Sequence, residues 1–123
     1  MEKPIKNILK SDPAIKVNGS LWLESASGHF FGPGPVELLE RIAESGSISV
    51  AAKEMNMSYK KAWALVNTLN EHTVNPVVIP QAGGKKGGGS TITAEALELI
   101  AYHRLLRQRF AAFLEQETKL LKL

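Results

Sequence analysis

The chain has 123 residues, of which 44% are hydrophobic and 22% charged, and its formal net charge is +3. These values are typical of one globular domain with a modest core, and no apolar run is long enough for a signal peptide or a membrane span. The absence of cysteine excludes disulfides, thiolate metal sites and cysteine nucleophiles, and leads us to expect a cytoplasmic protein.

The excess positive charge lies in one part of the chain. Between residues 55 and 94 four lysines stand against a single glutamate, so this stretch carries a charge equal to that of the whole chain. The lysines are Lys60, Lys61, Lys85 and Lys86. A concentrated basic surface is typical of proteins that bind nucleic-acid phosphates, whereas scattered lysines would indicate an ordinary solvated face.

The N-terminal part predicts a flexible segment over residues 1–12, followed by a single domain over residues 13–123. Between residues 15 and 24 apolar side chains occupy odd positions, and this period of two predicts a strand. A turn at residues 25–28 would let residues 29–31 pair back as a second strand. A turn at Asn18-Gly19 is the alternative, but it would leave a first strand of only a few residues.

Two helices are predicted next. Pro35 suits the first turn of a helix that runs to about Ser45 and ends at Gly46. Ser47 would cap a short second helix, and Asn56 tolerates the left-handed turn after it. The inward-facing residues are Val36, Leu38, Leu39, Ile42 and Ala43 in the first helix, and Ile48, Ala51, Ala52 and Met55, followed by Met57, in the second.

Residues 58–71 predict a third helix, which completes a helix-turn-helix over residues 47–71. Ser58 is a good N-cap. Lys60 and Lys61 in the first turn oppose the helix dipole, which fits a helix whose N-terminus meets phosphates. We interpret Trp63 as a core residue between this helix and the strands after it, with a DNA contact as the alternative. The inward stripe is Ala62, Leu65, Val66 and Leu69, and the outward residues are Tyr59, Lys60, Trp63, Asn67 and Asn70.

Residues 76–93 predict two strands around a basic, glycine-rich loop. Pro76 and Pro80 flank the first strand and favour an edge position. The loop, GGKKGGGS at residues 83–90, lacks the G-x-x-x-x-G-K-[ST] pattern of a nucleotide-binding P-loop. Five glycines around two lysines could form a plain flexible tip, but we favour a basic finger that follows a nucleic-acid backbone.

A long helix is predicted over residues 94–121, capped by Thr93 with Glu95 and Glu98 near its N-terminus. Leu97, Ile100, Ala101 and Leu105 would cover the core of the domain. A second apolar stripe has no partner in the chain and predicts a homodimer. The residues of this stripe are Leu99, Tyr102, Leu106, Phe110, Phe113 and Leu120.

The sequence gives little support to an enzyme. His29, His72 and His103 are far apart and show no metal-ligand spacing, so we expect surface or interface residues. No Ser/His/Asp arrangement can be defended. We therefore predict no catalytic residues, no metal and no cofactor.

Two stretches carry a resemblance to a known family. They read GSIS-x-AAKEM-x-MSYKKAW at residues 46–63 and GGKKGGGS-x-x-T at residues 83–93. Both resemble the N-terminal DNA-binding domain of the molybdate-responsive ModE family, and the first also looks like LysR-type regulators. The resemblance covers roughly residues 21–114. It implies an α+β, mainly helical, winged helix-turn-helix fold with an N-terminal β-hairpin and a long C-terminal dimerisation helix.

The resemblance also implies a dimer that binds a palindromic DNA operator and regulates transcription. The recognition helix would be residues 58–71 and the tip of the wing residues 83–89. Full-length members of the family sense molybdate in domains after the long helix. This chain stops at Leu123, so we expect a stand-alone form that binds little molybdate.

The candidate DNA-binding residues lie on three predicted elements. Ser47 and Ser49 begin the second helix, where phosphates commonly bind, although capping explains Ser47 equally well. Asn67 could bond to adenine or to a phosphate. An alternative function is a protein-interaction module that uses the C-terminal helix, with incidental DNA binding. The full set is Ser47, Ser49, Ser58, Tyr59, Lys60, Lys61, Asn67, Lys85 and Lys86.

Overall fold

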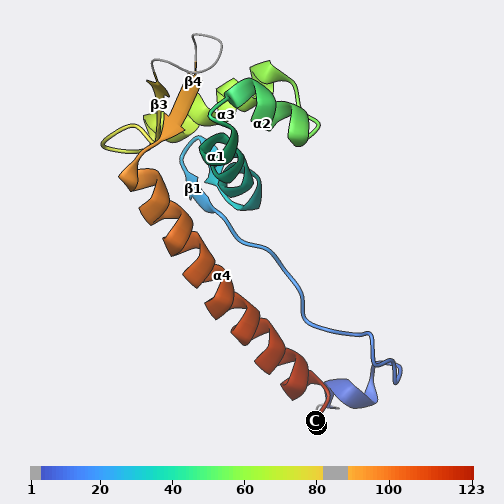
Figure 1. The fold of residues 1–123 in the computed structure, drawn as a ribbon. Helices are drawn as coiled ribbons and strands as arrows, with labels where there is room; N and C mark the ends of the chain where they lie inside the picture. Colours follow the sequence, from blue (N-terminus) through green and yellow to red (C-terminus); the bar gives the residue numbers. More distant parts are fainter. Residues whose placement is uncertain (1–3, 82–88) are drawn as a thin grey trace. The chain divides into compact units, whose positions relative to one another are not determined.

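The structure is a computed structural model, and it describes residues 4–81 and 89–123 (Figure 1). Its elements are η1 (Ile5–Asn7), β1 (Leu23–Ser25), β2 (Gly28–Phe31), α1 (Pro33–Ser45), α2 (Ile48–Glu54), α3 (Tyr59–Glu71), β3 (Val78–Gln81), β4 (Gly89–Ile92) and α4 (Ala94–Leu121). β1 pairs with β2 and β3 with β4, both antiparallel. The fold class is the predicted one, α+β and mainly helical.

The chain divides into two compact units. The helix-turn-helix unit is Trp22–His103, and the tail unit combines Met1–Leu21 with Arg104–Leu123. α4 contributes its first turns to the helix-turn-helix unit and the rest to the tail unit. No helix within residues 4–81 and 89–123 is long and apolar enough to cross a lipid bilayer.

One hydrophobic core holds the helix-turn-helix unit together. Its buried residues are Phe31, Leu38, Leu39, Ile42, Ala51, Ala52, Ala62, Val66, Leu69, Val77, Val78, Ala96 and Ile100. The predicted inward faces of α1, α2 and α3 are thereby confirmed, except that Ala43 is exposed. Ala51 and Ala62 are 0% exposed. Small residues at these positions let the three helices approach closely, because a larger side chain would overfill the contact.

Local signals end and begin the helices as predicted. α1 ends at Gly46, which is left-handed with φ 71° and donates its N–H to the Ile42 carbonyl at 2.8 Å. Ser47 Oγ accepts the Val50 N–H at 3.1 Å, and Ser58 Oγ accepts the Lys61 N–H at 3.1 Å. Asn56 between α2 and α3 is left-handed, with φ 54°. These bonds satisfy N–H groups that the helices cannot pair internally.

The N-terminal hairpin forms at the later of the two predicted turns. Its register is Leu23↔Phe31, Glu24↔His29 and Ser25↔Gly28. The prediction of a strand from residue 15 is wrong, because β1 covers only Leu23–Ser25. β2 has four residues and offers pairing partners for a short strand only. Further upstream, the Val17 N–H donates instead to Thr118 Oγ1 at 2.9 Å, within the tail unit.

β3 and β4 form a two-stranded pair, called here the β3–β4 pair. Its register runs from Val78↔Ile92 to Gln81↔Gly89. Val77 and Val78 are buried at its base. The predicted loop lysines, Lys85 and Lys86, lie outside the described residues. The described strands therefore show how the base of this hairpin is held in place.

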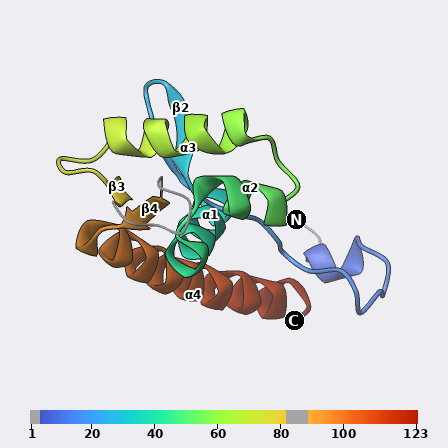
Figure 2. The ribbon, with the colours of Figure 1, turned by 45° about the horizontal axis from the view of Figure 1, so that its top comes forward.

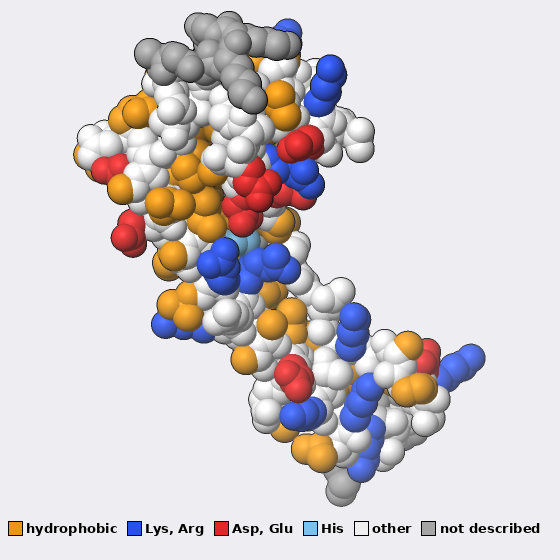
Figure 3. Space-filling model, viewed as in Figure 1, with side chains coloured by type: hydrophobic (Ala, Val, Ile, Leu, Met, Phe, Trp, Pro, Cys, Tyr) orange, Lys and Arg blue, Asp and Glu red, His pale blue; other side chains and the backbone are white. Residues whose placement is uncertain are grey.

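α4 has the predicted bounds, and Thr93 Oγ1 accepts the Ala96 N–H at 3.3 Å as its cap. The predicted core-facing side is wrong at three of its four positions, because Leu97, Ala101 and Leu105 are exposed. The buried residues are Ala96, Ile100 and His103. These three repeat at helical spacing on one face, turned by about 100° from the predicted one. Hydrophobic side chains stay exposed along α4 (Figure 3).

His103 was predicted at a surface or interface, and this is wrong. Its side chain is 3% exposed and its ring meets Phe31 edge to face, with ring centroids 5.6 Å apart. The position follows from the face of α4 that turns toward the core. An imidazole ring can fill an apolar position when an aromatic neighbour packs against it.

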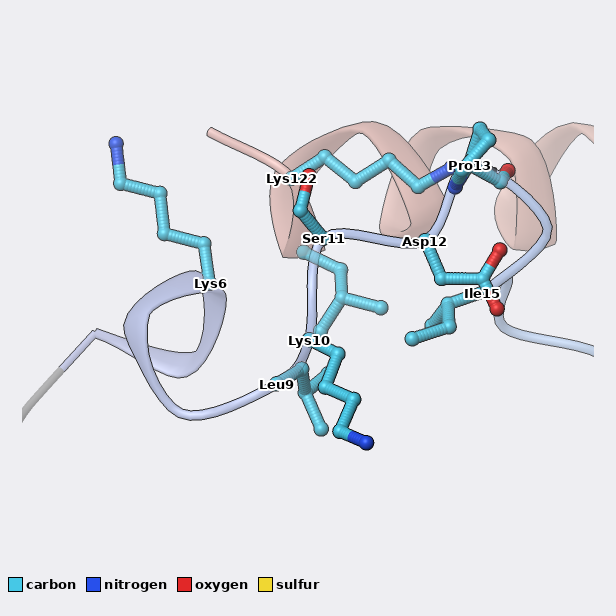
Figure 4. A pocket seen from close by; sticks show the side chains of 9 residues that line it. Lys6, Leu9, Lys10, Ser11, Asp12, Pro13, Ile15 and Lys122 are labelled. Carbon is cyan, nitrogen blue, oxygen red and sulfur yellow. Dashed lines mark hydrogen bonds between the residues drawn. The ribbon is translucent and has the colours of Figure 1, made fainter.

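The tail unit packs the N-terminal segment against the C-terminal half of α4. Lys122 Nζ donates to the Pro13 carbonyl at 2.9 Å. A side chain at Gly19 would lie 3.2 Å from the Phe110 ring, which stacks on Phe113 with centroids 6.4 Å apart. The unit contains a cavity of about 370 Å³ lined by Lys6, Leu9, Lys10, Ser11, Asp12, Pro13, Ile15, Leu121 and Lys122. Lys6 and Lys10 extend in different directions (Figure 4), so the cavity does not gather their charges.

Candidate nucleic-acid interface

α2 and α3 lie side by side and are joined by the turn at residues 55–58 (Figure 2). Arg41 on α1 braces the first helix of the pair. Its guanidinium pairs with Glu54 of α2 at 3.3 Å and with Glu37 of α1 at 3.3 Å. Hydrogen bonds to Glu54 and then Glu37 raise the pKa of Arg41 above its ordinary value. The pair therefore forms a helix-turn-helix whose first helix is tied to α1.

The N-terminus of α3 presents polar and basic side chains to solvent. Tyr59 is 55% exposed, and Lys60 and Lys61 are also exposed. Neither lysine makes an ion pair with any residue in the described part of the chain. Two cations held at a helix N-terminus favour an anionic partner, because the helix dipole already makes that end positive. The predicted clustering of these three residues is thus present.

The predicted serines differ in how far their hydroxyls are used. Ser47 and Ser58 serve as N-caps of α2 and α3, as described above. Ser49 is exposed on the first turn of α2. A capping hydroxyl accepts a backbone N–H but keeps its own proton for a second bond. Capping and phosphate contact are therefore compatible at Ser47 and Ser58.

Asn67 lies on the exposed side of α3, as predicted. Its Nδ2 donates to Glu71 Oε1 at 3.1 Å, one helical turn further along. This bond orients the side-chain amide along the helix axis. The Glu71 carboxylate thus lies at the C-terminal end of this face of α3, and the positive charge of Lys60 lies at the N-terminal end of the same face.

Asn70 was predicted to face outward, and this is wrong. Its Oδ1 accepts the N–H groups of Val77 at 2.8 Å and Val78 at 3.4 Å, and its Nδ2 donates to the Val78 carbonyl at 3.3 Å. One side chain therefore fastens the last turn of α3 to the start of β3. No local pattern in the sequence distinguishes this asparagine from an exposed one, because its partners follow a loop.

A second bond fastens β4 to the start of α2. The Ser90 N–H donates to the Gly46 carbonyl at 2.9 Å, directly before the Ser47 cap. Thr93 completes the base of the pair, because its Oγ1 donates to the Pro76 carbonyl at 2.9 Å. The β3–β4 pair is thus held to both helices of the helix-turn-helix. α3 and the base of the β3–β4 pair are therefore held in a fixed position relative to each other.

Trp63 was interpreted as a core residue, and this is wrong. Its side chain is 51% exposed. The core beneath α3 is already filled by Ala62, Val66 and Leu69. Position 63 is turned by about 100° from position 62, which brings it out of the core. Trp63 is therefore a surface residue of the candidate interface, a position compatible with the alternative of a DNA contact.

The N-terminal hairpin of β1 and β2 stabilises the C-terminal end of α3 through His72. The His72 Nδ1–H donates to the Thr68 carbonyl at 2.8 Å, and Nε2 bonds to Ser25 Oγ at 2.8 Å. Phe30 stacks on the same ring, with centroids 4.1 Å apart. His72 is thus half-buried and structural. Across residues 4–81 and 89–123, no group of three His, Asp or Glu side chains could hold a metal ion.

Comparison with known proteins gives several related sequences. The chain is 42% identical over 79 residues to the DNA-binding transcriptional dual regulator ModE of Escherichia coli (strain K12), covering 64% of this chain and 30% of that protein. It is 37% identical over 81 residues to the molybdenum transport protein ModE of Azotobacter vinelandii, covering 66% and 30%. It is 39% identical over 97 residues to the molybdenum-pterin-binding protein MopB of Rhodobacter capsulatus, covering 79% and 36%.

The chain spans about a third of the length of these curated relatives, between 30% and 36%. No protein-family model matches it. Among solved structures, ArgP from Mycobacterium tuberculosis is similar over 69% of this chain and 30% of its own, with 13% identity and a TM-score of 0.48. A likeness of that degree carries no argument about fold or function.

Proposed function

Since the matched part of this chain belongs to the ModE family, as its resemblance predicts, we propose that the chain is a DNA-binding regulator of transcription. One relative carries that description in its name, and the three relatives reported above have the names of regulators, transporters or binding proteins. These names agree with the prediction that the chain is not an enzyme. DNA is therefore the partner proposed for the candidate interface.

The observation that carries this proposal is the exposed, basic start of α3. Tyr59, Lys60 and Lys61 project from a helix that α2 braces and that the β3–β4 pair holds at its far end. This is the geometry with which a recognition helix enters the major groove. Lys60 and Lys61 would bind phosphates or guanine, and Asn67 would bond to adenine or a phosphate further along.

The other predicted contacts surround the recognition helix. We propose that the hydroxyls of Ser47, Ser49 and Ser58 donate to backbone phosphates at the ends of α2 and α3. The β3–β4 pair would act as the base of a wing, and Lys85 and Lys86 would follow the neighbouring part of the duplex. Both lysines lie outside the described residues, so their role is derived from the sequence alone.

A homodimer through α4 is part of the proposal. Tyr102 is 47% exposed and Phe113 is 56% exposed, while Leu106 and Phe110 are partly covered. Leu99 is partly exposed but packs against the core of the helix-turn-helix unit. A two-fold dimer would present two copies of α3 and would read a palindromic operator, one half-site per protomer. A cytoplasmic location and little molybdate binding stay predictions.

The proposal is tested by selecting bound duplexes from a random DNA pool and titrating the enriched sequence against a scrambled one. We expect enrichment of a palindrome and tighter binding to it by at least a factor of about 1,000. Equal, weak binding to both duplexes would contradict the proposal. Together with capture of a protein partner through α4, that result would favour the protein-interaction module.

A further inference from the structure

An aromatic strip lies exposed on α3. It consists of Tyr59 and Trp63, which are 55% and 51% exposed and stand one helical turn apart on the same side of the helix. Trp63 makes no hydrogen bond and no ring contact within the described residues, whereas Trp22, also exposed, packs against the His29 ring in a tilted arrangement with centroids 4.0 Å apart. Tryptophan has a large apolar surface that a small domain would normally bury. Its exposure on α3 indicates a surface prepared for a partner.

Packing and hydrogen bonds prevent a rotation of α3 that would bury this strip in the core. Ala62, the neighbour of Trp63, is 0% exposed against the other helices. Asn70 lies two helical turns beyond Trp63 on the same side, and its three hydrogen bonds hold it to Val77 and Val78. A rotation of α3 about its axis would break these bonds and expose Ala62. The indole is therefore fixed on the outside of the helix.

The chemistry of the strip indicates what it meets. An indole offers a flat apolar face and one N–H donor, with no acceptor. The exposed Lys60, three positions before Trp63 and therefore on the same side of the helix, supplies positive charge beside it. Residues near the N-terminus of a recognition helix contact base edges, and the thymine C5-methyl is the apolar group in the major groove. The side chain thus matches a thymine flanked by phosphates.

We infer that Trp63 packs against a thymine methyl group in each half-site and is a specificity-determining residue of the DNA interface. This inference rests on the proposed function, since it requires that α3 enters the major groove. It assigns to Trp63 a direct contact with a base, in addition to the phosphate or guanine contacts proposed for Lys60 and Lys61. Tyr59, one turn closer to the N-terminus, lies along the same strip and continues its apolar surface.

The test removes the methyl group and the indole separately. The full chain is titrated against its selected duplex, in which each thymine is replaced in turn by deoxyuridine, a change that removes only the C5-methyl. In each half-site we expect one thymine position to be sensitive. Replacing the thymine there should weaken binding by the wild type about fourfold, which is the effect of one buried methyl group. In Trp63→Ala the same replacement should have no effect, and binding to the unmodified duplex should be weaker.

Two further variants keep the test decisive. Trp63→Phe retains an apolar ring and should keep part of the sensitivity to the methyl group. It tests the inference also in the case that Trp63→Ala folds poorly. Trp22→Ala removes an exposed tryptophan outside the interface and should behave as the wild type does. A thermal melt of each variant shows whether it is folded during the titration.

The inference is overturned if the wild type is insensitive to every deoxyuridine, or if either Trp63 variant keeps the full sensitivity of the wild type. In those cases the proposed function still stands, provided that the selected duplex binds more tightly than a scrambled one. If the wild type does not distinguish the two duplexes, the proposed function fails and the inference fails with it.

Discussion

The side-chain oxygen of Asn70, on the last turn of α3, accepts the backbone N–H of Val77 at 2.8 Å. The bond joins the proposed recognition helix to the segment that leads into β3. Val77 is 0% exposed, so its N–H has no access to water as a replacement partner. A single side chain therefore links the position of the β3–β4 pair to that of α3.

Asn70→Ala should destabilise the protein by about 1–3 kcal/mol, because it leaves buried backbone groups of Val77 and Val78 without partners. Urea unfolding followed by circular dichroism measures this change. Asn67→Ala is the matched control, since Asn67 is exposed one turn earlier and, among the described residues, bonds only to Glu71; it should change stability by less than about 0.5 kcal/mol. Equal effects of the two variants would show that Asn70 does not hold β3.

Lys60→Ala and Lys61→Ala should each weaken DNA binding on all sequences. Each variant loses one phosphate contact, so the slope of log Kd against log salt concentration should fall by about 0.9. Fluorescence anisotropy at several salt concentrations measures both quantities. Lys16→Ala, an exposed lysine of the tail unit, is the control of equal charge. A slope unchanged in both α3 variants would exclude these lysines from the interface.

Substitutions at Ser58 should separate its two roles. Ser58→Ala removes the N-cap of α3 and should cost about 1 kcal/mol of stability. Ser58→Asp keeps the cap and complements the helix dipole, so its stability should match that of the wild type. Its carboxylate would repel a phosphate, so DNA binding should weaken although the fold is intact. Wild-type affinity for Ser58→Asp would show that Ser58 acts as a cap alone.

Gly46→Ala should destabilise the junction of α1 and α2 by about 1 kcal/mol, because its φ of 71° strains any residue with a Cβ. Gly34→Ala is the matched control. Gly34 lies in the first turn of α1 without a left-handed φ, so alanine there should cost less than alanine at position 46, its Cβ meeting only the ring of the following Pro35. Thermal melts of the two variants should show the larger decrease for Gly46→Ala.

Phe113→Asp should dissociate the proposed dimer, because it places a charge in an apolar contact on α4. Sedimentation equilibrium at micromolar concentration measures the mass. Ala112→Asp introduces the same charge at the adjacent exposed position and should leave the mass unchanged. A wild type that sediments as a monomer, or a Phe113→Asp variant that stays dimeric, would contradict the proposed interface.

The helix boundaries of α1, α2 and α3 could be predicted from the sequence because their signals are local. Gly46 ends α1, Ser47 and Ser58 cap the next two helices, and Asn56 forms the turn between them. Each of these residues acts on backbone groups within four positions of itself. The exposed basic tip of α3 follows from the same logic, since Ala62, Val66 and Leu69 establish which side faces inward.

Other features depend on partners distant in sequence, and only the tertiary structure decided them. In the part of the chain that the structure describes, no strand pairs with the alternating pattern before residue 23, so β1 stays short. Asn70 turns inward because the start of β3 passes next to it, and α4 buries His103 because of the face it turns to the core. Trp63 stays outside because smaller side chains already fill the space beneath α3. The sequence determined where helices begin and end, through short-range hydrogen bonds, and long-range packing decided which side of each helix is left for a partner.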